Sequence, residues 1–79
     1  MIVRRQIRVE GIVQGVGYRP FVYALATRLS VSGCVSNDSQ GVSIEAEGER
    51  DNVDQFLAAL SRAAPPLAVI TRVSSRALG

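Results

Sequence analysis

The stretch over residues 11–20 constrains the fold most, because it joins two patterns that belong to different secondary structures. Apolar and polar residues alternate from Val3 to Val13, as expected for a strand with one buried face. Gly15 and Gly17 follow, and Pro20 then opens a run with helical spacing. The pattern predicts a strand, a tight loop and a helix in which Pro20 is the first residue.

The loop over residues 14–19 is predicted to hold an oxyanion. Gly15 and Gly17 allow a positive φ or a close approach of backbone N–H groups to a ligand, and Pro20 is expected to keep Arg19 extended. Loop N–H groups, the positive end of the helix and the Arg19 guanidinium would then converge on a phosphate-sized volume. The alternative is an ordinary turn whose glycines only reverse the chain and whose arginine is solvated.

Helical and strand patterns alternate along the rest of the chain. A helix is predicted over Pro20–Leu29, ending near Ser30, and a second helix begins after Gly48, which is expected to break the strand before it. Pro65 and Pro66 end the second helix. Three further strands are predicted, over Gly33–Asn37, Val42–Glu47 and Leu67–Ser75. Both helices carry apolar stripes at i, i+3, i+4 and i+7, formed by Val22, Leu25, Ala26 and Leu29, and by Val53, Phe56, Leu57 and Leu60.

The order of these elements is βαββαβ, which predicts an α+β, ferredoxin-like fold with two helices on one face of an antiparallel sheet. Arg5 is the one charged residue on the apolar side of the first strand. Three acidic residues, Glu49, Asp51 and Asp54, gather at the start of the second helix, where the helix dipole favours them. The open face of the sheet is expected to be polar, with the side chains of Gln6, Arg8, Glu10, Ser43, Glu45 and Glu47.

Residues 1–79 are expected to form one small domain, and the residue types that are missing exclude many functions. Without histidine or lysine there is no Ser-His-Asp triad, histidine metal site, Walker A loop or Schiff base. The single cysteine, Cys34, cannot form an internal disulfide, which fits a cytoplasmic location, and it is interpreted as a small core or strand residue. The net charge of +2 does not call for nucleic acid, and no apolar run approaches the ~20 residues of a membrane span.

Two motifs give the chain a family resemblance. Val13-Gln14-Gly15-Val16-Gly17-Tyr18-Arg19 resembles the phosphate loop of acylphosphatases, and Gly33-Cys34-Val35-Ser36-Asn37, with Gly41-Val42 and Gly48, resembles their second signature. The resemblance implies hydrolysis of acyl phosphates with no metal and no cofactor. It implies that Arg19 binds the phosphoryl group and that Asn37 orients the attacking water, although the pattern alone also allows Asn37 to be a turn residue. The loop residues that would bind phosphate are Gln14, Gly15, Val16, Gly17, Tyr18 and Arg19.

Two further segments resemble one branch of this family, the N-terminal acylphosphatase-like domain of the hydrogenase maturation carbamoyltransferases. They are Arg19-Pro20-Phe21-Val22-Tyr23 and Ala64-Pro65-Pro66-Leu67-Ala68. The branch implies carbamoyl phosphate as substrate, release of inorganic phosphate, and a longer chain whose other domains and hydrogenase maturation proteins are the partners. Residues 1–79 would then be an N-terminal fragment of it.

Three alternatives to this branch are open. The chain is otherwise a free-standing acylphosphatase, or a non-catalytic domain that binds an anion or docks a partner. An RNA-recognition module on the same frame is disfavoured, because the predicted open face has no aromatic residue on which a base could stack.

Overall fold

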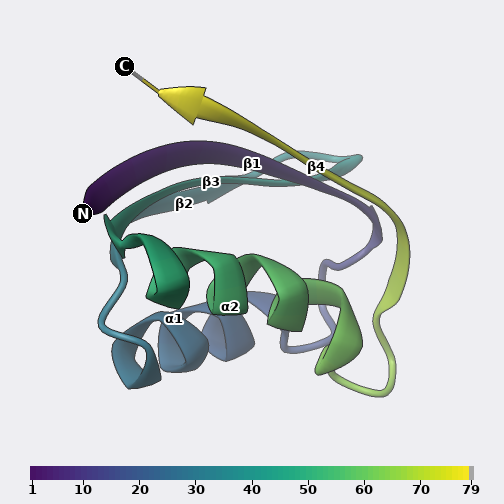
Figure 1. Cartoon of the computed structure of the whole chain (residues 1–79). Helices are drawn as coiled ribbons and strands as arrows, with labels where there is room; N and C mark the ends of the chain where they lie inside the picture. Colours follow the sequence, from purple (N-terminus) through teal and green to yellow (C-terminus); the bar gives the residue numbers. More distant parts are fainter. Residues whose placement is uncertain (79) are drawn as a thin grey trace.

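A computed structural model describes residues 1–78 and confirms the predicted order of elements. One antiparallel sheet has the strand order β2-β3-β1-β4, and both helices lie against the same face of it (Figure 1). The elements are β1 (Ile2–Ile12), α1 (Tyr18–Arg28), β2 (Ser32–Asn37), β3 (Gly41–Glu49), α2 (Arg50–Arg62) and β4 (Val69–Leu78). The α+β, ferredoxin-like architecture expected from the sequence is therefore correct.

The alternation in β1 places its apolar side chains under the helices. Ile7 and Val9 are fully buried there, and they lie opposite Ile44 and Val42 of β3. The intervening side chains form the open, polar face. Arg5, the charged exception, reaches α2 from the helix-facing side, where its Nη2 lies 3.3 Å from Asp54 Oδ1. An ion pair between sheet and helix thus accounts for a charge in an apolar position.

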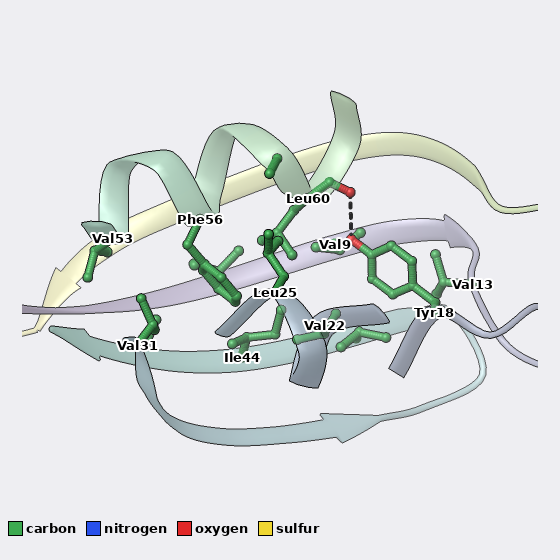
Figure 2. Close-up of a cluster of buried hydrophobic side chains, with 14 residues drawn as sticks. Val9, Val13, Tyr18, Val22, Leu25, Val31, Ile44, Val53, Phe56 and Leu60 are labelled. Atoms are coloured by element: carbon green, nitrogen blue, oxygen red, sulfur yellow. Dashed lines mark hydrogen bonds between the residues drawn. The ribbon is translucent and has the colours of Figure 1, made fainter. Parts of the chain in front are cut away.

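The core lies between the sheet and the two helices, as Figure 2 shows. The Tyr18 ring is 1% exposed, and its hydroxyl donates a 2.8 Å hydrogen bond to the backbone oxygen of Leu60. Burial raises the pKa of Tyr18 to about 12, so the phenol stays neutral. This hydrogen bond joins the start of α1 to the last turns of α2. The buried side chains are Ile7, Val9, Val13, Tyr18, Val22, Leu25, Val31, Val42, Ile44, Ala46, Val53, Phe56, Ala59 and Leu60.

Several element boundaries differ from the predicted ones. Gly48 does not break β3, which continues to Glu49 because Gly48 pairs with Val3 of β1. The last strand begins at Val69, two residues later than predicted, and runs on to Leu78. Pairing with β1 decides where β3 ends and where β4 begins and ends. In β3 this pairing overrides the low strand propensity of Gly48.

The acidic residues near α2 do not all serve its dipole. Asp51 alone lies in the first turn. Asp54 pairs with Arg5, and the carboxylate of Glu49 accepts a 2.8 Å hydrogen bond from the N-terminal ammonium of Met1.

Neither helix within residues 1–78 is long and apolar enough to cross a membrane.

Helix α1 ends in a Schellman motif at Ser30. The N–H of Val31 donates to Ala26 O at 2.8 Å, and the N–H of Ser30 donates to Thr27 O at 3.3 Å. Ser30 has a φ of 56°, which is the left-handed conformation that this motif requires. A residue other than glycine therefore carries a Cβ where the backbone disfavours one.

Ser30→Gly is expected to stabilise the fold by about 0.5–1 kcal/mol, because glycine takes a positive φ without a steric cost. Urea denaturation monitored by circular dichroism should show a higher midpoint. Ser32→Gly is the matched control, since Ser32 has ordinary strand geometry in β2 and glycine there should lower the midpoint. A lower midpoint for Ser30→Gly would contradict the left-handed end of α1.

Candidate active site

The loop between β1 and α1 is shaped by the backbone of its two glycines. Gly15 and Gly17 have φ values of 70° and 80°, and a Cβ on either would meet no atom within 4 Å. Glycine is therefore needed there for its conformation and not for space. Gly17 is also the N-cap of α1, where no side chain caps the helix and no acidic residue lies in the first turn. The positive end of α1 thus has no negative group of its own.

Helix α1 begins two residues earlier than predicted. Tyr18 is its first residue, so Arg19 is helical, and the expectation that Pro20 would hold Arg19 extended is wrong. Pro20 is third in the helix, where the backbone N–H of any residue lacks an intrahelical acceptor, so proline loses no hydrogen bond there. The early start places the Arg19 side chain beside the loop.

A cavity of about 600 Å³ opens at this end of the sheet. Arg19 and Asn37, which lie in different elements, meet at it: Arg19 Nη1 donates a 3.3 Å hydrogen bond to Asn37 Oδ1. Asn37 is the last residue of the edge strand β2. The residues that line the cavity are Val13, Gln14, Gly15, Gly17, Tyr18, Arg19, Pro20, Tyr23 and Asn37.

Two predicted phosphate-binding residues have side chains that pack in or against the core. The Tyr18 ring is buried in the core, and Val16 packs against the core and is not among the lining residues. Any contribution of theirs to anion binding comes from the backbone. Tyr23 also lines the cavity, although it was not among the predicted site residues, and it is half exposed one turn after Arg19.

The turn that follows Asn37 is held by Asp38. Its Oδ1 accepts hydrogen bonds from the N–H groups of Gln40 and Gly41 at 2.9 and 3.0 Å, which is a local pattern typical of aspartate in turns. The Arg8 guanidinium of β1 reaches the same carboxylate in a fork, with Nη1–Oδ2 and Nη2–Oδ1 distances of 3.0 Å. The hydrogen bond from Arg8, followed by that from Gln40, lowers the pKa of Asp38 to about 2. Sequence reasoning placed Arg8 only on the polar face.

The match to known proteins covers nearly the whole chain. The family model of acylphosphatases matches residues 5–78. The chain belongs to the acylphosphatase family. It is 49% identical over 70 residues to an acylphosphatase of Thermotoga petrophila, a match that covers 87% of this chain and 77% of that one. An acylphosphatase structure from Coxiella burnetii superposes with a TM-score of 0.91 at 32% identity, covering 99% of this chain and 82% of that chain.

The acylphosphatase domain is equally similar to part of a much longer kind of protein. It is 51% identical over 71 residues to carbamoyltransferase HypF2 of Cupriavidus necator, which covers 90% of this chain and 9% of that relative. The structure of full-length HypF in the phosphate- and nucleotide-bound form superposes with a TM-score of 0.93 at 41% identity, covering 99% of this chain and 10% of that one. The chain thus spans about a tenth of the length of these relatives.

Cys34 was predicted to be a small core or strand residue. It lies in β2, so the strand alternative is confirmed, but it is exposed, so the prediction of a core position is wrong. It pairs with Glu45 of β3, and its Sγ donates to Glu45 Oε2 at 3.4 Å. This hydrogen bond, followed by desolvation, raises the pKa of the thiol. The acylphosphatase domain therefore keeps Cys34 protonated, which opposes a nucleophilic role.

The open face of the sheet lacks the side chains of an RNA-stacking surface. All four aromatic residues of the chain lie on helices: Tyr18, Phe21 and Tyr23 in α1, and Phe56 in α2. Stacking on aromatic rings is the main source of affinity for single-stranded RNA on folds of this order. None of the aromatic residues therefore lies on this face, where a base would stack.

Replacing Asp38 by asparagine is expected to lower the urea midpoint near neutral pH but not near pH 2. The pKa of Asp38 is lowered to about 2 in the folded chain, from about 3.9 unfolded, so its charge stabilises the fold above pH ~4. That contribution disappears as the pH falls through about 2. Midpoints of the wild type and of Asp38→Asn should therefore converge on acidification. A difference that is the same at both pH values would show that the shape of the turn matters and the charge does not.

Proposed function

We propose that this domain hydrolyses acyl phosphates and that carbamoyl phosphate is its biological substrate, within a carbamoyltransferase that serves maturation of nickel-iron hydrogenases. The hydrogen bond between Arg19 and Asn37, beside the uncapped end of α1, is the observation that carries the hydrolytic part. A charged donor, a neutral amide and the loop residues Gln14, Gly15 and Gly17 line one cavity. That set suits a dianionic phosphoryl group with water beside it.

In the proposed mechanism the loop over residues 14–19 and the Arg19 fork bind the phosphoryl oxygens. Asn37 orients a water molecule whose oxygen attacks phosphorus, while the bond from phosphorus to the acyl oxygen breaks and its electron pair leaves on that oxygen. The phosphoryl oxygens take the proton of the water, and inorganic phosphate is released. The leaving carboxylate or carbamate is a weak base, so positioning and charge stabilisation suffice without a histidine.

The choice of carbamoyl phosphate is supported by sequence segments and not by overall identity. The identities to the HypF2 carbamoyltransferase and to the Thermotoga acylphosphatase are 51% and 49%, too close to discriminate. Two segments, Arg19–Tyr23 and Ala64–Ala68, resemble the carbamoyltransferase branch. On this proposal the partners are other domains of a longer cytoplasmic chain and hydrogenase maturation proteins, with no nucleic acid, membrane or cofactor at this site.

Purified domain is expected to release phosphate from both benzoyl phosphate and carbamoyl phosphate. The cavity recognises the phosphoryl group that the two share, so the values of kcat/KM should be similar. If the domain releases phosphate from neither substrate, the result would favour a non-catalytic domain that binds an anion or docks a partner.

The gene offers a second test of the proposal. A reading frame that continues past Gly79 for several hundred residues with cysteine-rich motifs supports the carbamoyltransferase, whereas an early stop codon supports a free-standing acylphosphatase.

Asn37→Ala is expected to lower kcat by about 10- to 100-fold, because a misplaced water attacks inefficiently. The inhibition constant of inorganic phosphate should stay close to that of the wild type, since Arg19 and the loop remain. Initial rates with benzoyl phosphate, with phosphate as a competitive inhibitor, give both values. A parallel loss of phosphate inhibition would assign Asn37 to anion binding instead.

A further inference from the structure

An ion pair on the open face of the sheet connects the central strand β1 to the turn after Asn37. Arg8 extends across β3, where its Nη1 also donates a 3.0 Å hydrogen bond to Ser43 Oγ, and its fork ends on Asp38. The guanidinium is partly shielded, with 28% of the side chain exposed. One side chain of β1 thus reaches across β3 to the turn, where it contacts the residue that follows Asn37.

Within residues 1–78, the other arginines on this face make no comparable link. Arg76 donates to Gln6 of the adjacent strand, and Arg4 lies 3.3 Å from Glu47 of its neighbour β3. Those contacts join strands that the backbone ladder already pairs. An exposed ion pair adds only modest stability. The distinctive property of the Arg8–Asp38 pair is that it links β1 to the turn after β2.

Asp38 transmits this restraint to the backbone. Its Oδ1 accepts from Gln40 and Gly41 as well as from Arg8, and its own N–H donates to Gly41 O at 2.9 Å. One weaker contact, from Gly11 N–H to Gln40 O at 3.3 Å, also ties the turn to β1. Loss of Arg8 should therefore loosen the turn without unfolding it.

We propose that the Arg8–Asp38 pair is a positioning device, which holds the turn after β2 so that the Asn37 amide stays in place beside Arg19. The inference rests on the proposed function, since Asn37 must orient water for its position to affect turnover. Arg19 restrains the tip of the Asn37 side chain, and Asn37 pairs with Val42 of β3. The Arg8–Asp38 pair restrains the turn that begins directly after Asn37. A bidentate fork fixes orientation as well as distance, which a lysine cannot reproduce.

Arg8→Ala is expected to reduce kcat by about tenfold, with KM and the inhibition constant of phosphate nearly unchanged, because binding uses Arg19 and the loop. Arg8→Lys should recover part of the loss, and Asp38→Asn should resemble Arg8→Ala. Arg76→Ala is the matched control, since Arg76 lies on the same face and contacts no residue of the turn. It should leave kcat unchanged.

A double-mutant cycle separates positioning from a general loss of stability. In an Asn37→Ala background, Arg8→Ala should cause little further loss of kcat, because the residue that it positions is gone. Additive losses, or a wild-type kcat in folded Arg8→Ala, would overturn the inference. Should Arg8→Ala fail to fold, Arg8→Lys and Asp38→Asn serve in the same cycle.

Amide hydrogen exchange and the NMR signals of the Asn37 side chain give a readout that needs no turnover. Arg8→Ala should speed exchange at Gln40 and Gly41 and shift the Asn37 amide signals, whereas Arg76→Ala should not. A wild-type domain that released no phosphate would sink the proposed function, while the exchange result would still decide whether the pair holds the turn. If amide exchange at Gln40 and Gly41 and the Asn37 signals are unchanged in Arg8→Ala, the Arg8–Asp38 pair does not hold the turn.

Discussion

Arg19→Lys is expected to cut acyl phosphate hydrolysis by roughly 10²-fold or more while leaving the fold intact. The Arg19 guanidinium is planar and can donate to two phosphoryl oxygens at once, whereas an ammonium keeps the charge without the fork. The side chain is exposed at the cavity and its only hydrogen bond goes to Asn37 within residues 1–78, so the core does not depend on it.

Initial rates with benzoyl phosphate, and circular dichroism to verify folding, check the Arg19 prediction. Arg28→Lys is the matched control, because Arg28 is an exposed arginine in the last turn of the same helix, away from the cavity. Turnover of Arg19→Lys close to that of the wild type would remove Arg19 from the mechanism.

Gly33→Ala is expected to destabilise the domain by more than about 3 kcal/mol, a large part of the roughly 5–15 kcal/mol that small domains have. Gly33 has a φ of 144°, and a Cβ there would lie 1.8 Å from the backbone oxygen of Glu45. Backbone atoms of β3 would have to move, because no flexible side chain is available to yield.

The urea midpoint and the rate of phosphate release should both fall in Gly33→Ala, since β2 also carries Asn37. Cys34→Ala provides a control in the same strand, where the side chain is exposed and its replacement is small. An unchanged midpoint for Gly33→Ala would show that β2 approaches β3 less closely than the structure has it.

The order of elements and the faces of β1 were predictable because alternation and helical spacing are local patterns. The face of β2 on which the Cys34 side chain lies was not predictable, because a shift of one residue in strand register exchanges the two faces of a strand. Its pairing with Glu45 fixes that side, and pairing is a long-range property. The start of α1 was missed because the first helical turn tolerates proline at more than one position.

The part of the candidate site that is continuous in sequence was predictable, whereas the part that joins distant segments was less so. The loop and Arg19 follow from glycine spacing and a helix start, and Asn37 was named through the family resemblance. The Arg8–Asp38 pair joins residues 30 positions apart across an intervening strand. Only the register of β1, β3 and β2 brings them together, and no local pattern encodes that register.

Both ends of the described chain emerge far from the cavity. Arg4, near the start of β1, pairs with Leu78 at the end of β4, whereas the Gly15–Gly17 loop follows the opposite end of β1 (Figure 1). Eleven residues of strand separate the two ends of β1, which is roughly 35 Å. A further domain fused at either end would therefore be attached at the end of the sheet opposite the mouth of the cavity. A fused neighbour that collects a short-lived product such as carbamate has to fold back along the length of the sheet to reach it.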